Sequence, residues 1–252
     1  MISDAEFQRF QRQICLPEIT EQGQKTLFEA KLLIIGCGGL GTAAAQYLAA
    51  AGVKNLVIAD YDDVELSNLP RQLTYRDTDI GKLKVDVLAD YLQQLAPDCR
   101  VRRIARKMDL SLLSLEVGLS DMVLDCTDNQ ATRKYINQAC WQAKKNLIAA
   151  SAIGWKGQLW SFDFSRLSQG CYQCLLPKND DESAQLTCQS KGIVGAIVGT
   201  LGCLQALLSL QKILSLSTLA SHQLLHFDGL SFNWQQWAMP IDPHCVVCSR
   251  KE

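Results

Sequence analysis

The sequence predicts an α/β fold built on a doubly wound, mostly parallel sheet, and two observations predict it. Apolar runs of strand length alternate with helical segments throughout residues 31–151. Strands joined by helices pair in parallel, with helices on both faces of the sheet. The alternation stops after Gly157, where strand-like runs are interrupted by one long apolar helix. The parallel part is therefore expected to end there, within one compact domain.

Five strands are predicted in the first part: 31–36, 55–60, 99–104, 121–126 and 146–151. Four of them are mainly apolar, as expected for strands covered on both faces, whereas CRVRRI (99–104) carries three arginines and is expected to be more exposed. Helical segments are predicted at 42–52, 82–95 and 129–145. The first is rich in alanine and ends at Gly52, and the second carries an apolar stripe that ends before Pro97. Strands are expected again at 158–164, 224–229 and 232–237.

The composition excludes several classes of protein and partner. The chain has 252 residues, 48% hydrophobic and 20% charged, with a formal net charge of −1. Disordered and collagen-like chains depend on charge or on glycine and proline, so neither class fits. A near-neutral chain gives no electrostatic reason to expect a nucleic acid or an anionic membrane as partner. The start of the chain has no apolar signal core, so a cytoplasmic location is expected.

An uncharged run extends from Gly192 to Gln211 and is long enough to suggest a membrane span. The alternative is a helix buried on every side within a soluble domain. A single such run in an otherwise globular α/β pattern favours the buried helix.

Eleven cysteines are present, and an odd number in a chain without a secretory signal argues against a disulfide framework. Four are predicted to be small core residues: Cys37, Cys99, Cys126 and Cys140. Four others form two C-x-x-C hooks: Cys171, Cys174, Cys245 and Cys248. Two hooks can hold one tetrahedral Zn²⁺, whereas two redox pairs remain the alternative. The sequence thus predicts a zinc-tied C-terminal part, with a structural and not a catalytic metal.

A glycine-rich turn joins the first predicted strand to the first helix. Gly36, Gly38 and Gly41 have the spacing G-x-G-x-x-G, and Asp60 ends the next strand. Such glycines permit a tight turn and close approach of phosphates, while the carboxylate receives ribose hydroxyls. This arrangement predicts a Rossmann-like nucleotide site. NAD is the default ligand, and a turn needed only for packing is the structural alternative.

The loops that follow the next strands are unlike those of a dehydrogenase. DYDDVELSNLPRQ (60–72) is dense in polar residues, Lys84 opens the next helix, and Asp128 follows the fourth strand. Because the carboxyl ends of parallel strands line one crevice, these groups are expected to converge. Arg71 and Lys84 can neutralise phosphate charge, and Asp128 can hold Mg²⁺. The pattern therefore indicates triphosphate chemistry.

Eight segments together resemble the ThiF/MoeB family of adenylating enzymes, which are related to the ubiquitin-activating enzymes. They are RFQRQI (9–14), IIGCGGLG (34–41), ADYDDVELSNLPRQ (59–72), the Lys84 region, VLDCTDN (123–129), SAIGWKGQL (151–159), CYQCLLP (171–177) and CVVC (245–248). The resemblance covers nearly the whole chain. It implies adenylation, with ATP and Mg²⁺, of the C-terminal Gly-Gly carboxylate of a ubiquitin-like sulfur-carrier protein.

The resemblance also implies a role for each matching residue. Residues expected to bind the nucleotide are Gly36, Gly38, Gly39, Gly41, Asp60, Ser67, Asn68, Arg71, Lys84, Asp128 and Asn129. Arg12 matches an arginine that family members extend across a homodimer interface to the partner's ATP. Cys188 matches a cysteine implicated in later sulfur transfer, although a loop cysteine without chemistry is equally compatible. A non-catalytic scaffold that binds the carrier is a further alternative.

The motifs CYQCLLP and SAIGWKGQL are more similar to thiamine-pathway ThiF than to molybdopterin-pathway MoeB. A ThiS-like carrier is therefore expected, with a MoaD-like carrier as the alternative and a sulfur-donating desulfurase left open as a further partner. The single domain, 1–252, is expected to comprise an N-terminal helical arm (1–30), a nucleotide-binding part (31–151) and a part for carrier and zinc (152–252).

Overall fold

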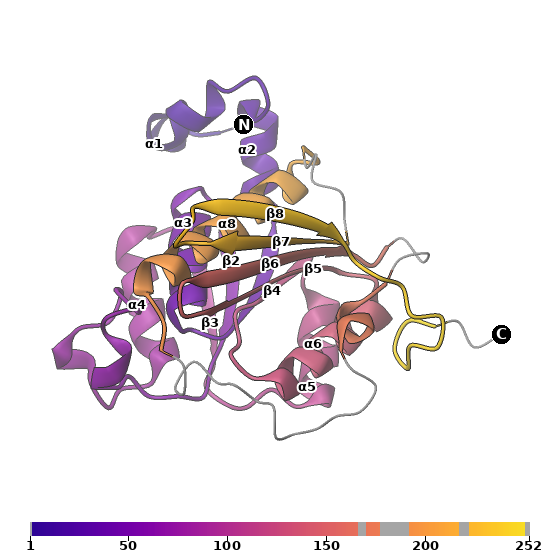
Figure 1. The fold of residues 1–252 in the computed structure, drawn as a ribbon. Helices are drawn as coiled ribbons and strands as arrows, with labels where there is room; N and C mark the ends of the chain where they lie inside the picture. The colour runs from indigo at the N-terminus through magenta and orange to yellow at the C-terminus, as the bar shows by residue number, and fades with distance from the viewer. Residues whose placement is uncertain (1, 166–169, 177–191, 217–221, 250–252) are drawn as a thin grey trace.

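The central sheet has eight strands in the order β3-β2-β1-β4-β5-β6-β7-β8 (Figure 1). The computed structural model describes residues 2–165, 170–176, 192–216 and 222–249. Strands β3, β2, β1, β4 and β5 pair in parallel, and β5 to β8 pair antiparallel. The predicted mostly parallel sheet is therefore confirmed, and the predicted change after Gly157 coincides with the first antiparallel strand.

The strands are β1 (Lys31–Ile35), β2 (Asn55–Ala59), β3 (Arg100–Ile104), β4 (Met122–Asp125), β5 (Asn146–Ile153), β6 (Lys156–Asp163), β7 (Gln223–Asp228) and β8 (Asn233–Ala238). The α-helices are α1 (Asp4–Ile14), α2 (Thr20–Glu29), α3 (Gly39–Ala50), α4 (Lys84–Leu95), α5 (Leu110–Leu119), α6 (Gln130–Ala143) and α8 (Gly195–Ile213). Three short 3-10 helices are η1 (Leu66–Asn68), η2 (Asp77–Asp79) and η3 (Tyr172–Leu175).

Two apolar cores lie on opposite faces of the sheet, because successive residues of a strand point to opposite sides. Leu32 and Ile34 of β1 join the core that α3, α4 and α8 cover. Leu33 and Ile35 of the same strand join the core that α5 and α6 cover. All four side chains are almost fully buried, as the continuous apolar run predicts for a doubly wound fold.

Helix α5 was not predicted from the sequence. Its ten residues, LSLLSLEVGL, are apolar around most of the helix, so no single face stands out. The Asp109 side chain accepts a hydrogen bond from the Leu112 N–H at 2.8 Å, which caps the helix N-terminus. Only Leu113, Glu116 and Val117 within α5 are buried, and Leu115 and Leu119 are exposed.

Helix α8 corrects the expectation of a helix buried on every side. By length and apolar composition it could cross a membrane, and it packs against α3, β5 and β6. Its inner face is buried at Val198, Leu201 and Ala206, whereas Leu207 on the other side is 50% exposed. The absence of charge over 192–211 therefore reflects one buried face together with an outer apolar stripe.

Helices α1 and α2 lie together at the top of Figure 1 and contact the C-terminal end of α3, away from the glycine turn. The Gln13 side chain donates to the Ala51 carbonyl at 3.0 Å, just beyond the C-terminus of α3. Lys54 and Glu6 form an ion pair at 2.6 Å. Since α3 has 12 residues, the arm and the glycine turn are separated by about 18 Å of helix.

Two glycines of α8 give opposite predictions for the same substitution. A Cβ on Gly202 would lie 2.5 Å from the Leu40 carbonyl oxygen and 2.8 Å from Ala43 Cβ, whereas a Cβ on Gly199 meets no atom within 4 Å. We expect Gly202→Ala to lower the free energy of unfolding by about 1–3 kcal/mol through overpacking against α3. Gly199→Ala should raise it by up to about 1 kcal/mol through helix propensity. Urea denaturation of both variants tests this, and equal effects would contradict the close packing of α3 and α8.

Candidate nucleotide site and zinc centre

The glycine turn between β1 and α3 has a shape that side chains would prevent. Gly36 has φ +96°, and a Cβ on Gly41 would lie 1.8 Å from the Gly36 carbonyl oxygen. Gly38 occupies the N-cap of α3, where no side chain accepts a hydrogen bond from the first turn. The N–H groups of that turn are therefore open to a ligand, and a helix N-terminus favours an anion such as phosphate.

Asp60 lies beside this turn, directly after β2. Its Oδ2 accepts a hydrogen bond from the Cys37 N–H at 2.6 Å, and its Oδ1 accepts one from the Asp62 N–H at 2.9 Å. Burial raises the pKa of Asp60, and the two backbone hydrogen bonds oppose that effect. The carboxylate is thus fixed at the position where the fingerprint predicts ribose recognition.

Lys84 is a cation in an unfavourable place for the free protein. It is the first residue of α4, where the helix dipole disfavours positive charge. Its side chain is 8% exposed, and its Nζ lies 3.0 Å from Oδ2 of Asp62, which is 50% exposed. Its charge also lowers the pKa of the neighbouring Asp60 carboxyl, so two carboxylates lie near this buried cation. A phosphate at this position would be a further anionic partner for the ammonium group.

The loop after β2 packs directly against the glycine turn. A Cβ on Gly39 would lie 2.4 Å from the Arg71 carbonyl oxygen. Arg71 is half-buried, and its Nη1 donates to the Ser67 carbonyl at 2.8 Å. Asn68 is buried and its amide lies 3.4 Å from the Ser67 hydroxyl, so η1 is tied together within itself. The structure therefore brings 67–71 to the start of α3, as predicted.

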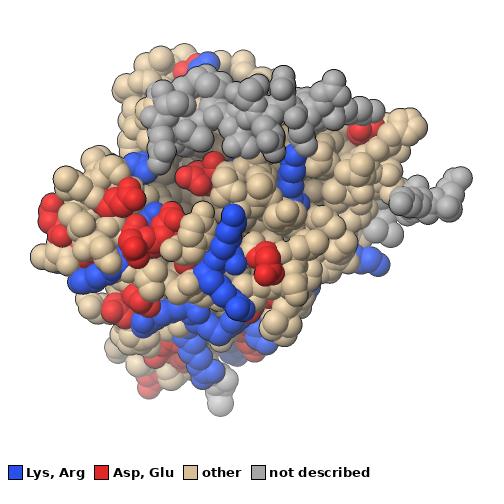
Figure 2. Space-filling view, turned by 90° about the horizontal axis from the view of Figure 1, so that it is seen from below, with Lys and Arg blue, Asp and Glu red and all other residues tan. Residues whose placement is uncertain are grey.

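The loop after β4 reaches the same place. A Cβ on Gly36 would lie 2.6 Å from the Cys126 carbonyl oxygen. The pKa of the Tyr61 phenol is raised by burial and then by the charges of Asp62, Asp128 and Asp60, and is lowered by Lys84. The Asp128 carboxylate of the loop after β4 is therefore among the charges that act on Tyr61, together with Asp60 and Asp62 of the loop after β2. On the face seen from below, acidic and basic side chains are intermingled (Figure 2).

Asp128 and Asn129 differ in whether their side chains have hydrogen-bond partners within the protein. Asp128 is exposed and makes no hydrogen bond or ion pair within the described part of the chain. The Asn129 side chain accepts from the Thr132 N–H at 2.9 Å and so caps α6. A carboxylate free of protein partners suits a divalent cation. Asn129 has a clear structural role, and its contact with nucleotide stays a prediction.

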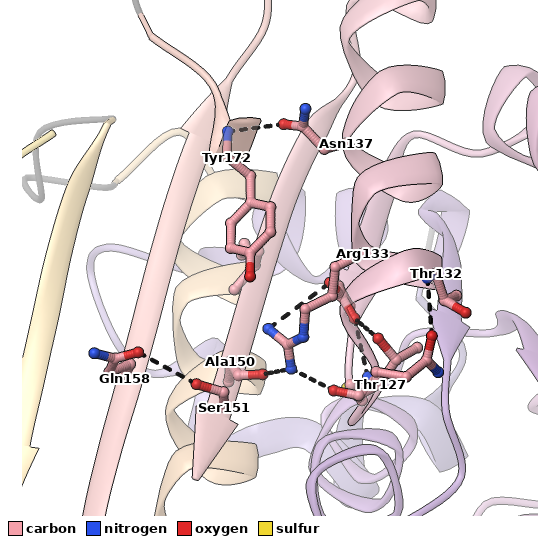
Figure 3. Close-up of polar contacts among 12 residues, drawn as sticks. Thr127, Thr132, Arg133, Asn137, Ala150, Ser151, Gln158 and Tyr172 are labelled. Atoms are coloured by element: carbon pink, nitrogen blue, oxygen red, sulfur yellow. Dashed lines mark hydrogen bonds and ion pairs between the residues drawn. The ribbon is translucent and has the colours of Figure 1, made fainter. Parts of the chain in front are cut away.

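Three buried polar residues near this loop were missed by the sequence reasoning: Asp125, Arg133 and Gln205. Arg133 lies beneath the loop with its guanidinium toward the ends of β4 and β5 (Figure 3). From the other face of the sheet, the Gln205 amide donates to the carbonyls of Asp125 at 3.0 Å and Ile148 at 3.2 Å. Arg133 was detectable, since it shares a helical stripe with buried Ile136 and Cys140 at spacings of three and seven residues.

Arg12 does not lie in this cluster, and Cys188 has no described position. Arg12 is exposed on α1, at the far end of α3 from the glycine turn, so it cannot serve the site of its own chain from this position. That placement is compatible with a role toward a second copy. Cys188 falls outside the described residues, so its role stays a prediction.

Four cysteines form the predicted metal centre: Cys171, Cys174, Cys245 and Cys248. Their sulfur atoms all lie within 4.8 Å of one another. The separation is 3.7 Å between Cys171 and Cys245 and 3.4 Å between Cys174 and Cys248. Tetrahedral thiolates about 2.3 Å from Zn²⁺ would be about 3.8 Å apart, whereas a disulfide needs about 2.05 Å. These four residues fit a zinc ion, and all four are free cysteines that form no disulfide.

Side chains around the cysteines also suit a metal. The Asn137 amide donates to the Cys171 sulfur at 3.4 Å, and its carbonyl oxygen accepts from the Tyr172 N–H at 2.9 Å. Hydrogen bonds of this kind orient thiolate ligands. Cys171 and Cys245 are almost fully buried, and a zinc ion held by four cysteines would have no open coordination position for a substrate. The centre can therefore tie η3 to the C-terminal segment.

Comparison with known proteins decides the family. The sequence profile of the ThiF family matches residues 10–247. The chain belongs to the ThiF family. It is 43% identical to the sulfur carrier protein ThiS adenylyltransferase of Escherichia coli K12, over 98% of this chain and 97% of that protein. It is 36% identical to the molybdopterin-synthase adenylyltransferase of the same organism, over 99% of both chains.

Other relatives of this ThiF-family chain are longer or more distant. It is 39% identical to adenylyltransferase and sulfurtransferase MOCS3 of Aedes aegypti, where the match spans 98% of this chain and 56% of that protein. A crystal structure of E. coli MccB with AMPCPP and MccA superposes with a TM-score of 0.78 at 22% identity, over 90% of this chain and 68% of that one. At that identity the likeness establishes the fold alone.

Removal of one zinc ligand should unfold the C-terminal part locally. We expect Cys245→Ser to reduce the zinc content from about one ion per chain to well below half and to lower the melting temperature. Cys15→Ser, which changes an exposed cysteine, serves as the matched control and should retain the metal. Elemental analysis after gel filtration measures the content, and full zinc in Cys245→Ser would contradict the four-cysteine centre.

Proposed function

We propose that the protein uses ATP to adenylate the C-terminal carboxylate of a ubiquitin-like sulfur-carrier protein, with release of pyrophosphate. The observation that carries the proposal is that the buried Lys84 ammonium and the exposed Asp128 carboxylate, which makes no hydrogen bond or ion pair in the described residues, both belong to segments that border one glycine turn. A triphosphate would contact the lysine, and its divalent cation would contact the carboxylate. The adenylyltransferase names of the two full-length relatives support the same chemistry.

The reaction requires little proton chemistry from the protein. The carrier's carboxylate is already ionised, and its oxygen attacks the α-phosphorus while the bond to the leaving pyrophosphate breaks. The products are an acyl-adenylate and pyrophosphate, and no general base is needed. Catalysis is then a matter of positioning and charge neutralisation.

The charged residues predicted for the site, and the first turn of α3, have separate roles in this reaction. Asp60 would hold the ribose, and the first turn of α3 would receive phosphate oxygens. Arg71 and Lys84 would neutralise charge that develops on the leaving pyrophosphate. Asp128 would hold Mg²⁺, which when bound shields the phosphate charge from the incoming carboxylate.

We propose a ThiS-like carrier, with a MoaD-like carrier as the second candidate. The higher identity to the ThiS adenylyltransferase, 43% against 36%, supports this order. Sulfur transfer through Cys188 and a desulfurase partner belong to a later step of the same proposal. The open edge of the sheet at β8, where Trp234 and Trp237 are exposed, offers a surface for the carrier.

Pyrophosphate exchange tests the proposed reaction directly. We expect incorporation of labelled pyrophosphate into ATP only when a carrier ending in Gly-Gly is added. Lys84→Met should reduce the exchange rate by about 10²–10³-fold, the typical loss for a group that stabilises developing charge. Lys82→Met, two residues away, removes an exposed lysine paired with Asp79 and should stay within about twofold of the wild type. Exchange without carrier, or equal losses in both variants, would contradict the proposal.

We further propose that the active form is a homodimer in which Arg12 of one copy completes the partner's site. The remote position of Arg12 within its own chain supports this arrangement, as does the outer apolar stripe of Tyr47 and Leu207, both at least half exposed. An arginine supplied in trans stabilises transition-state charge in other phosphoryl chemistry.

Complementation between inactive variants tests the trans arrangement. Arg12→Ala and Asp128→Ala should each lose exchange activity, and a mixed dimer regains one intact site. Coexpression should therefore restore about a quarter of the wild-type activity, since half the dimers are mixed and half their sites are intact. The same variants expressed separately are the control. No recovery in verified mixed dimers would show that Arg12 does not act in trans.

A further inference from the structure

Arg133 is almost completely buried, at 6% exposure, on the side of α6 that faces the ends of β4 and β5. Its Nη2 donates to the carbonyls of Thr127 and Ala150, the latter at 2.6 Å. Its Nη1 lies 4.0 Å from Oδ2 of Asp125, which is itself buried. The Trp160 ring lies 5.9 Å from the guanidinium carbon. Figure 3 shows this guanidinium between the Thr127 and Ala150 backbones.

These contacts lie where the parallel pairing ends. The register of β4 and β5 runs from Met122 with Asn146 to Asp125 with Ala149. Beyond that pair the chain at Thr127 is no longer part of the sheet. There the Arg133 guanidinium donates hydrogen bonds to carbonyls of both chain segments, Thr127 and Ala150. An unpaired buried carbonyl is costly, so Arg133 fixes the path of the loop at Thr127.

Asp128 is held on both sides by this arrangement. On one side, Thr127 is fixed through its carbonyl by Arg133 and through its N–H and hydroxyl by the Asp125 carboxylate, at 2.9 and 2.7 Å. On the other side, Asn129 caps α6. The backbone is therefore determined at both neighbours, while the Asp128 carboxylate makes no hydrogen bond or ion pair in the described ranges.

We propose that Arg133 is a positioning residue that aims the Asp128 carboxylate at the metal-bound nucleotide. The inference rests on the proposed function for the identity of the ligand. Arg133 itself does not reach that ligand, because it is buried and both of its terminal nitrogens face protein oxygens. Its planar fork spans two carbonyls and a carboxylate at once, which a lysine ammonium cannot reproduce.

The test is a double-mutant cycle on the affinity for ATP with Mg²⁺, measured by calorimetry on the full chain without carrier. We expect Arg133→Lys to weaken binding of Mg·ATP by about tenfold and to raise the Mg²⁺ concentration needed for half-maximal binding. In an Asp128→Ala background the same Arg133→Lys change should have no further effect, since the residue acts through Asp128. If Arg133→Lys does not fold, Arg133→Gln takes its place in the cycle.

Ile136→Ala is the matched control for loss of stability, because Ile136 is fully buried on the same helix, in the apolar core that α5 and α6 cover. It should lower the melting temperature without changing the Mg²⁺ dependence. An equal weakening by Arg133→Lys in both backgrounds, or no weakening at all, would overturn the proposal. A cycle that behaves as expected in a protein without carrier-dependent exchange would refute the proposed carrier reaction and leave the role of Arg133 intact.

Discussion

The carboxyl edge of the parallel sheet depends on two buried side chains that pair backbone carbonyls where strand pairing ends. Gln205 of α8 holds Asp125 and Ile148 from one face, and Arg133 of α6 holds Thr127 and Ala150 from the other. Gln205 thus bridges β4 and β5 at the last pairs of their ladder, and Arg133 bridges the two chain segments just beyond it. Without these bridges the loop that carries Asp128 would leave buried carbonyls unpaired, so the geometry of the site begins here.

The second constraint is the placement of charged groups at this edge of the sheet. Two of them stand where their charge does not stabilise the free protein. Lys84 opens a helix at the end where a cation is disfavoured, and burial raises the pKa of Asp60. Neither arrangement favours the free protein. Buried or perturbed ionisable groups of this kind are typical of binding sites. Around the four-cysteine centre, by contrast, the Asn137 amide group already has hydrogen-bond partners within the fold, Cys171 and Tyr172.

Much of the fold and part of the site could be predicted from sequence, for reasons that particular residues illustrate. Buried parallel strands such as Lys31–Ile35 are continuous apolar runs, and the G-x-G-x-x-G spacing places a turn between one of them and a helix. Helix α5 was missed because its leucines define no face, and the outer stripe of α8 was missed because it is as apolar as the inner one. Arg133 could not be given a role, since its partners are carbonyls that every residue possesses.

We propose that the loops after β1, β2 and β4 surround one metal-bound triphosphate. The most direct measurement is a crystal structure with a non-hydrolysable ATP analogue and Mn²⁺, located by its anomalous signal. We predict the ion within about 2.2 Å of an Asp128 carboxylate oxygen, with the triphosphate between Lys84 and the first turn of α3. A nucleotide bound elsewhere, or an ion away from Asp128 while Lys84 contacts solvent alone, would contradict it.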